Sequence, residues 1–400
     1  MSAAKLPTEI RAALPEACAW AACPTPAELR SLPSGPTIYL LLDTSETPVQ
    51  LATTQSLRRL LTARFAEVAG PRPGRTDLTE IVRAVRWRPV GTAFEARWWY
   101  YRLARALYPA DYRRRIAFGP AYFLNVDWDR AVPELRVTER IWCQPGQFIG
   151  PWASVKAAQE ALHGLWDLLD LCRYPEQVSR APHGTRCAYA EMGRCDAPCD
   201  GSVPLAAYLE RCRAAWRFAA GGVQPWIGAA AAEMQRAAAE RRYERAALLK
   251  RQIEFARYWQ RQWGPHVRVW EQFRCLLVLR VARRRAWKLL SFHGGHLTDG
   301  PVVTERRLVA GARTWLATPP EQPAANLSDA VRMEQTWLVG QWLLKPRPGE
   351  GFPVPLPDSG VPENLDDTLT QQARAFWSRL ETTRAEGSPD APDSNESLDK

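Results

Sequence analysis

Residues 186–201 read RCAYAEMGRCDAPCDG and place three cysteines in a segment that also contains Gly and Pro. A fourth cysteine precedes them, and the complete spacing is C-x14-C-x7-C-x3-C over Cys172, Cys187, Cys195 and Cys199. Four thiolates from a loop-rich segment suit a tetrahedral metal site, either zinc or an iron–sulfur cluster, and the spacing does not separate the two. Packing of small buried thiols is the alternative. This segment therefore predicts a metal centre in the middle of the chain.

The composition of the 400-residue chain indicates several domains and a basic surface. Hydrophobic residues make up 46%, which is enough for more than one buried core. The net charge is +10, and 47 of the 53 basic residues are Arg. Guanidinium groups pair well with phosphate oxygens, so nucleic acid is a candidate partner, although a solvated basic surface fits as well. No apolar run of about 18 residues and no signal peptide stand out, which predicts a cytoplasmic protein without membrane contact.

Hydrophobic periodicity predicts an α+β, multidomain fold. We expect a small mixed β-sheet with helices, then a cysteine-cluster region, a helical hairpin and a small α/β domain. The segments are a leader (1–33), the sheet with its helices (34–115), a connecting α/β segment (116–171), the cysteine-cluster region (172–222), the hairpin (226–262), a sheet-plus-helix domain (265–345), a Pro-rich segment with a helix (346–385) and a disordered tail (386–400).

Within residues 34–115 the expected order of elements is β-β-α-β-α, interrupted by a Gly- and Pro-rich link at 70–74. Its strands are Ile38–Asp43, Pro48–Ala52 and Ile81–Arg88, with helices from Ser56 and over Phe94–Leu107. Further strands are expected at Tyr122–Trp128, Leu135–Trp142, Leu276–Val281, Ala286–Phe292 and Val302–Leu308. Further helices are expected at Ser154–Leu171, Ala206–Ala220, Ser328–Leu344 and 363–384, and Gly221-Gly222 should separate the hairpin from the helix before it.

The cysteine segment and its flanks closely resemble the central region of proteins of the excinuclease C (UvrC) family. The resemblance rests on RCAYAEMGRCDAPCDG, on GQFIGPWASVKAAQEALHGLWDLLDLC (146–172) and on YLERCRAAWRFAAGG (208–222). In that family the four cysteines are associated with an iron–sulfur cluster, and all four have a match here. The resemblance therefore implies a 4Fe-4S cluster, with zinc as the alternative, in a structural role.

Residues 234–253, MQRAAAERRYERAALLKRQI, resemble the UVR motif, the helical hairpin by which excinuclease C docks excinuclease B. The resemblance implies an excinuclease B-like partner. Its candidate docking residues are Met234, Tyr243, Glu244, Ala247 and Ile253. Arg241 stands where the motif usually has Leu, and Tyr243 replaces its Phe. A different partner, or a hairpin that packs only within this protein, therefore remains open.

The amino-terminal domain resembles the GIY-YIG nuclease domain. Thr37-Ile38-Tyr39 and Gln50-Leu51-Ala52 stand at the two signature positions, while QLATTQSLRRLLTARF (50–65) and FEARWWYYRLARALYP (94–109) match the strand and helices that follow. The family's chemistry is phosphodiester hydrolysis with one divalent metal ion, Mg²⁺ or Mn²⁺.

Most catalytic positions of that nuclease domain are replaced. The alignment retains Tyr39 but places Gln50, Leu60 and Tyr100 where the family has a Tyr, the phosphate-binding Arg and the metal-binding Glu. Gln cannot act as a base, Leu cannot contact phosphate, and a protonated phenol is a poor ligand for a hard metal. Glu95 coincides with a non-catalytic Glu of the family. The domain is therefore expected to be inactive, and the family's second nuclease domain, which is RNase H-like, is expected to be absent.

These features together predict a DNA-repair protein of the nucleotide-excision-repair type that acts as a non-catalytic accessory. It would bind DNA and dock another protein. The candidate DNA-binding residues are Arg58, Arg59, Arg83, Arg86 and Arg88. One alternative is a UVR-containing protein-interaction adaptor or regulator. A second is a divergent metal-dependent endonuclease.

Overall fold

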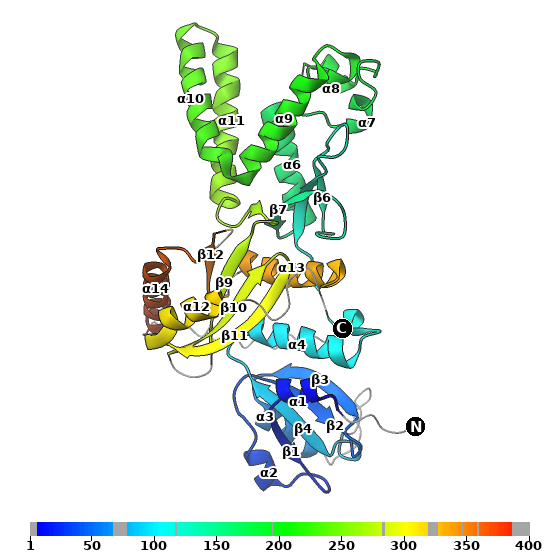
Figure 1. The fold of residues 1–400 in the computed structure, drawn as a ribbon, viewed down its shortest axis with the longest axis vertical. Coiled ribbons are helices and arrows are strands. Elements are labelled where there is room, and N and C mark those ends of the chain that lie inside the picture. Colours follow the sequence, from blue (N-terminus) through cyan, green and yellow to red (C-terminus); the bar gives the residue numbers. More distant parts are fainter. Residues whose placement is uncertain are drawn as a thin grey trace.

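The computed structural model describes residues 6–66, 78–116, 118–193, 195–281, 285–318, 327–345, 347–357 and 360–385. Three four-stranded sheets and a projecting helical hairpin follow one another along the long axis of the molecule (Figure 1). The predicted α+β, multidomain class is confirmed. The link at 70–74 and the tail at 386–400 lie outside the described residues. Within the described ranges, no helix has the length and apolar character needed to cross a membrane.

The first sheet has the strand order β1-β4-β2-β3, and every pair in it is antiparallel. Its strands are β1 (Glu16–Ala19), β2 (Thr37–Leu42), β3 (Pro48–Thr54) and β4 (Ala84–Pro89). The expected hairpin of β2 and β3 is present, with Tyr39 opposite Ala52. Strand β1 lies in the segment interpreted as a leader. Sequence periodicity missed it because its four residues are mostly exposed and carry no apolar alternation.

Helices cover both faces of this sheet. Helix α3 (Leu57–Ala66) packs on the face that carries Tyr39 and Leu41. Helices α1 (Thr8–Ala13) and α4 (Ala93–Leu107) pack on the other face. Helix α2 (Pro26–Arg30), which a capping box at Thr25 begins, lies beside α3. Because successive residues of a strand point to opposite faces, β2 supplies both cores and is buried along its whole length.

The second sheet has the antiparallel order β6-β5-β7-β8. Its strands are β5 (Tyr122–Val126), β6 (Arg136–Thr138), β7 (Gln147–Trp152) and β8 (Arg268–Val269). The strand expected at Leu135–Trp142 is thus only three residues long, and β7 was not predicted. Helix α6 (Val155–Leu169) packs against this sheet, and Ser154, where a helix was expected to start, caps it by accepting a hydrogen bond from the backbone N–H of Ala157 at 3.2 Å.

The cysteine region and the hairpin consist of short and long helices in succession. They are α7 (Pro175–Val178), α8 (Ala188–Glu191), η1 (Pro198–Asp200), α9 (Leu205–Arg217), the π-helical turn η2 (Phe218–Gly222), α10 (Val223–Ala239) and α11 (Tyr243–Gln262). The predicted break at Gly221 is present, since its φ of 124° is outside the helical range. Helices α10 and α11 form the expected pair, which projects away from the sheets (Figure 1).

The third sheet has the antiparallel order β11-β10-β9-β12. Its strands are β9 (Arg274–Arg280), β10 (Ala286–His293), β11 (His296–Thr304) and β12 (Gly351–Leu356). The helices near it are η3 (Glu305–Arg307), α12 (Leu308–Ala317), α13 (Asp329–Leu344) and α14 (Leu365–Ala385). The prediction of a strand at Val302–Leu308 was wrong in its bounds, because β11 ends at Thr304. The positive φ angles of Gly294 and Gly295 close a two-residue turn, so β11 begins directly after it at His296.

Helix α4 is shared by two hydrophobic cores. Trp99 and Leu103 pack toward the first sheet, whereas Phe94, Trp98 and Tyr101 pack with the third sheet and α13. Figure 1 shows the helix lying between these two sheets, and the short helix α5 (Tyr112–Arg115) continues from its end. The amino-terminal domain is therefore joined to the rest of the molecule through a helix that belongs to both cores.

Candidate nucleic-acid and partner-docking sites

The four positions aligned with the nuclease site do not form one catalytic group. Tyr39 is 3% exposed and packs with Leu57 and Leu61 in the core under α3. Leu60 is half-buried at the edge of the same core. Gln50 lies opposite Leu41, so its side chain is on this face as well.

Tyr100 lies on the other side of the sheet. Its ring packs at the edge of the core formed by α1, α4 and the opposite face of β2. Its hydroxyl group donates to the carbonyl oxygen of Arg115 at 3.4 Å. The fold thus separates Tyr100 from Tyr39, and none of the four positions carries a carboxylate.

The five candidate DNA-binding arginines are largely engaged inside the domain. Arg58, Arg83, Arg86 and Arg88 each donate hydrogen bonds to backbone carbonyl oxygens. Arg86 and Arg88 reach the carbonyls at the carboxyl end of α1, where they satisfy acceptors that the helix leaves open. Arg59 is exposed on α3. Four of the five guanidinium groups therefore stabilise the fold of this domain.

Three of the four cysteines expected to bind metal interact with one another. Cys172, Cys195 and Cys199 are buried. A hydrogen bond from the Cys172 thiol lowers the pKa of Cys195 to about 6, and the same bond, with burial, raises the pKa of Cys172. The charge of Cys195 and burial both raise the pKa of Cys199, burial being the larger cause.

Cys187 is half-buried and lies at the residue before α8. Its loop is held near Cys199, since the backbone N–H of Gly184 donates to the Cys199 carbonyl oxygen at 2.8 Å. Among the residues that the structure describes, no three His, Cys, Asp or Glu side chains are arranged to hold a metal ion. The four thiols fit a thiolate-bound group in their chemistry.

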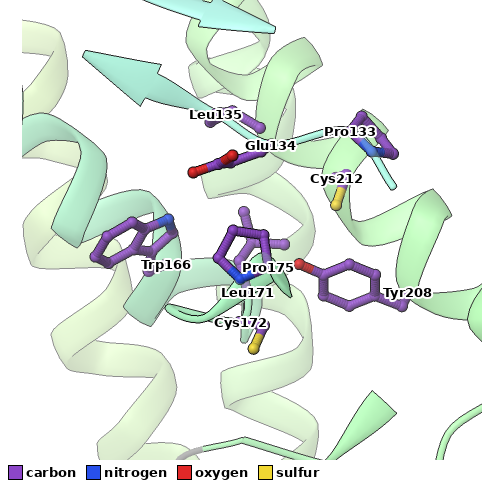
Figure 2. Close-up of a pocket in the computed structure, with 9 residues that line it drawn as sticks. All are labelled: Pro133, Glu134, Leu135, Trp166, Leu171, Cys172, Pro175, Tyr208 and Cys212. Atoms are coloured by element: carbon purple, nitrogen blue, oxygen red, sulfur yellow. The ribbon is translucent and has the colours of Figure 1, made fainter. Parts of the chain in front are cut away.

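A small pocket lies on the α9 side of Cys172 (Figure 2). Leu171 and Pro175 line it, and Figure 2 shows the Tyr208 ring and the Cys212 thiol entering it from α9. The Tyr208 hydroxyl interacts with the Cys212 thiol and with the Cys172 backbone, and burial raises the pKa of Tyr208. Cys212 thus supports the cysteine region as a packed core residue.

The predicted docking residues divide into exposed and buried groups on the hairpin. Tyr243 is 68% exposed, and Glu244 and Ala247 are exposed beside it. Ile253 and Met234 instead contribute to the small core between α10 and α11. The exposed group gathers near the turn of the hairpin, at the end far from the sheets (Figure 1).

The turn itself places Arg241 in an uncommon conformation. Its φ is 59°, in the left-handed region, and the N–H of the next residue donates to the Ala237 carbonyl at 2.8 Å. This is the Schellman arrangement, in which Gly is the preferred residue. Arg241 therefore ends α10 and is exposed, so the charge at this motif position is solvated in the free chain.

Sequence reasoning missed a group of carboxylates that hold α4 to the third sheet and α13. Glu334 is 1% exposed and accepts hydrogen bonds from Tyr112 at 3.0 Å and from Arg113 at 2.7 Å. Glu350 accepts from the backbone N–H of Ala93 at 2.8 Å. Sequence position gave no signal for these contacts, because they join segments more than 200 residues apart.

A buried cluster of charged side chains lies in the same contact between α4 and the third sheet. Lys288 forms an ion pair with Asp299 at 3.0 Å. Glu95 is 6% exposed, and burial raises its pKa while its bond from the Gly91 N–H and the charge of Lys288 oppose that rise. Glu95, for which no catalytic role was predicted, thus lies in the contact between the amino-terminal domain and the domain of the third sheet.

Comparison with known proteins identifies the middle of the chain. Residues 121–218 match the family described as "UvrC/Cho excinuclease, middle domain". This match covers the second sheet up to β7, α6, the cysteine segment and α9. The chain is therefore a multidomain α+β protein whose middle domain is similar to that of excinucleases.

Curated relatives extend the similarity beyond this domain. The UvrABC system protein C of Geobacter sp. (strain M21) is 26% identical over 280 residues, which cover 69% of this chain and 42% of the relative. The protein of the same name from Saccharopolyspora erythraea is 27% identical over 230 residues, or 57% of this chain and 32% of the relative. Over the matched residues the chain is similar to proteins of the UvrC family, and it spans less than half the length of these relatives. No solved structure matches it.

Proposed function

We propose that this chain is a non-catalytic, UvrC-like accessory protein that binds DNA and docks a second protein in nucleotide excision repair. The observation that carries the proposal is the identity of the residues at the positions aligned with the nuclease site. Gln50 and Leu60 take the places of the base and the phosphate-binding Arg, and Tyr100 lies on the opposite face of the sheet from Tyr39. A strongly basic chain of this kind would then bind DNA but lack the side chains that cleave a phosphodiester bond.

The chemistry of the replaced residues supports this proposal. Cleavage of a phosphodiester needs stabilisation of the charge that develops on the phosphate, and loss of one such group costs about 100-fold or more in rate. The Leu60 side chain packs in the core and has no polar atom to offer. The Tyr39 side chain is buried beneath α3. Mg²⁺ or Mn²⁺ would prefer carboxylate oxygens, which these positions lack.

The hairpin supports the docking part of the proposal. Relatives of this chain are named UvrABC system protein C, and a UvrB-like protein is accordingly the proposed partner. Tyr243 offers a large, 68% exposed aromatic side chain at the end of the hairpin, and Leu248 is 38% exposed nearby. Aromatic side chains that become buried between two proteins often dominate the binding energy. This exposed group also favours the second candidate function, a protein-interaction adaptor that does not bind DNA.

An iron–sulfur cluster is the proposed cofactor, with zinc as the alternative. Cys172, Cys195 and Cys199 would hold it together with Cys187, and the bound group would supply a structural cross-link between the segment after α6 and the loops around α8 and η1. The proposed place of action is the cytoplasm, where bacterial DNA lies.

A nicking assay tests the catalytic part of the proposal. Damaged and undamaged duplex DNA would be incubated with anaerobically purified full-length chain and Mg²⁺ or Mn²⁺, with Tyr39→Phe as the matched variant. We expect no nicking above the level without protein. Nicking that Tyr39→Phe abolishes would show a divergent endonuclease and overturn the proposal.

A further inference from the structure

The outer face of α11 carries an excess of positive charge in its second half. Lys250, Arg251, Arg257 and Arg261 are all exposed, and we call these four residues the α11 basic face. No hydrogen bond or ion pair of their side chains is present within the described part of the chain. The acidic side chain in the same stretch is Glu254.

The first part of the hairpin is different, because its charges are compensated. Arg245 binds Glu233 through two hydrogen bonds of 2.7 and 3.0 Å, and Arg242 pairs with Glu240 at 2.6 Å. The hairpin therefore has two regions of distinct chemistry. Its turn presents an aromatic residue among paired charges, whereas its base presents unpaired cations.

Helix geometry aligns the basic face along the helix axis. Lys250, Arg257 and Arg261 are 7 and 4 residues apart, spacings that return to nearly the same side of a helix with 3.6 residues per turn. Leu249 and Ile253 of α11 are buried in the hairpin core, whereas these cations are exposed beside them.

The length of the basic face suits a nucleic-acid backbone. At 1.5 Å per residue, it extends for about 16 Å, which is the axial length of about five phosphates on one strand of duplex DNA. Three of its four cations are Arg, whose planar guanidinium groups pair with phosphate oxygens. A solvated helix of this length would ordinarily alternate both charges, as the first part of this hairpin does.

We propose that the α11 basic face binds the phosphate backbone of duplex DNA, so that one hairpin serves nucleic acid at its base and a protein near its turn. This inference rests on the proposed function and moves the main DNA contact away from the amino-terminal arginines. Arg58, Arg83, Arg86 and Arg88 already bind backbone carbonyls, whereas the four cations of α11 are available.

The test compares two variants of the full-length chain that remove the same charge. The first combines Lys250→Gln, Arg251→Gln, Arg257→Gln and Arg261→Gln. The control combines four exposed cations around the third sheet, as Arg306→Gln, Arg307→Gln, Lys345→Gln and Arg374→Gln. Binding to a fluorescent duplex would be measured by anisotropy over a series of KCl concentrations, with circular dichroism to verify the helix content.

We expect the α11 variant to bind at least about 10-fold more weakly and to lose about 2–4 from the slope of log affinity against log salt. The control variant should change affinity by less than about 3-fold, since it removes only distant charge. Equal effects of the two variants, or no effect of the first, would overturn the inference. Failure of the unmodified chain to bind DNA would instead overturn the proposed function.

Discussion

Tyr101 donates a hydrogen bond of 3.0 Å from its hydroxyl group to Oε2 of Glu334, although 233 positions separate the two residues. The bond joins α4, which begins in the amino-terminal domain, to α13, which lies against the second and third sheets. The proximity of Glu334 and burial raise the pKa of Tyr101, burial being the larger cause, so Tyr101 remains a donor. The amino-terminal domain is thereby fixed to the domain that follows the hairpin.

Removing the charge of Glu334 should destabilise this junction. Glu334→Gln replaces an acceptor by an amide that would turn an N–H toward Tyr101, Tyr112 or Arg113. We expect the free energy of unfolding, from urea titration, to fall by about 2–3 kcal/mol, the usual cost of leaving buried partners of a charged group unsatisfied. Glu9→Gln, at an exposed position on α1, should change it by less than about 0.5 kcal/mol. Equal stability of the two variants would mean that Glu334 does not hold the domains together.

The close approach of Gly91 to β9 gives a second test of the same contact. A Cβ atom at Gly91 would lie 2.2 Å from the carbonyl oxygen of Arg280 and 2.4 Å from the Cα of Val281. Gly91→Ala should therefore lower the free energy of unfolding by about 1–3 kcal/mol, because backbone atoms must shift. Gly35→Ala is the matched control, since nothing lies within 4 Å of its Cβ position. A Gly91→Ala protein as stable as the control would contradict this packing.

Glu271 should make stability depend on pH. Burial raises its pKa from 4.5 to about 7, while its Oε1 accepts a hydrogen bond of 2.7 Å from the Phe148 N–H. The folded protein then binds a proton at Glu271 more tightly than the unfolded chain does. The resulting contribution of Glu271 to the free energy of unfolding is therefore complete below pH 4.5 and is lost as the pH rises to about 7.

The matched variant for this prediction is Glu271→Gln, which cannot ionise. Between pH 4.5 and pH 7 the original chain should lose about 2 kcal/mol of unfolding free energy relative to the variant, after discounting for the partial exposure of Glu271. Urea titrations of both proteins at several pH values measure this difference. A difference that stays constant with pH would show that Glu271 titrates normally.

The cysteine proposal predicts a specific metal content. Anaerobically purified chain should contain about four iron atoms with matching acid-labile sulfide, measured by elemental analysis and absorption spectroscopy. Cys172→Ser and Cys187→Ser should each abolish this content, whereas Cys23→Ser, at an exposed position, should leave it unchanged. Stoichiometric zinc would establish the alternative, and a chain without metal would contradict the cofactor proposal.

Sequence patterns predicted the elements that depend on local physics. They include the start of a helix at Ser154, the break at Gly221 and the helical hairpin within 226–262, and each depends on neighbouring residues. The unpredicted strands have a different cause. Strand β12 contains Pro353 and Pro355, which exclude a central strand but are tolerated at the edge of a sheet, where β12 pairs with β9 alone.

The candidate site was predictable only in part, for a related reason. Residue types predicted the replacement of nuclease positions, but not that Tyr100 and Tyr39 lie on opposite faces of the sheet. The same types suggested DNA contacts for Arg86 and Arg88, whereas their partners at the end of α1 are more than 70 residues away. Partners of a long, flexible side chain depend on tertiary structure, which local patterns do not contain.

The most direct test of the central claim is a binding titration of the full-length chain with duplex DNA in the presence of Mg²⁺, over a range of salt concentrations, with nicking recorded in the same samples. We expect the chain to bind DNA with an affinity that falls steeply as salt is added, and we expect the DNA to stay intact throughout. Salt-independent or absent binding would contradict it, and so would nicked DNA.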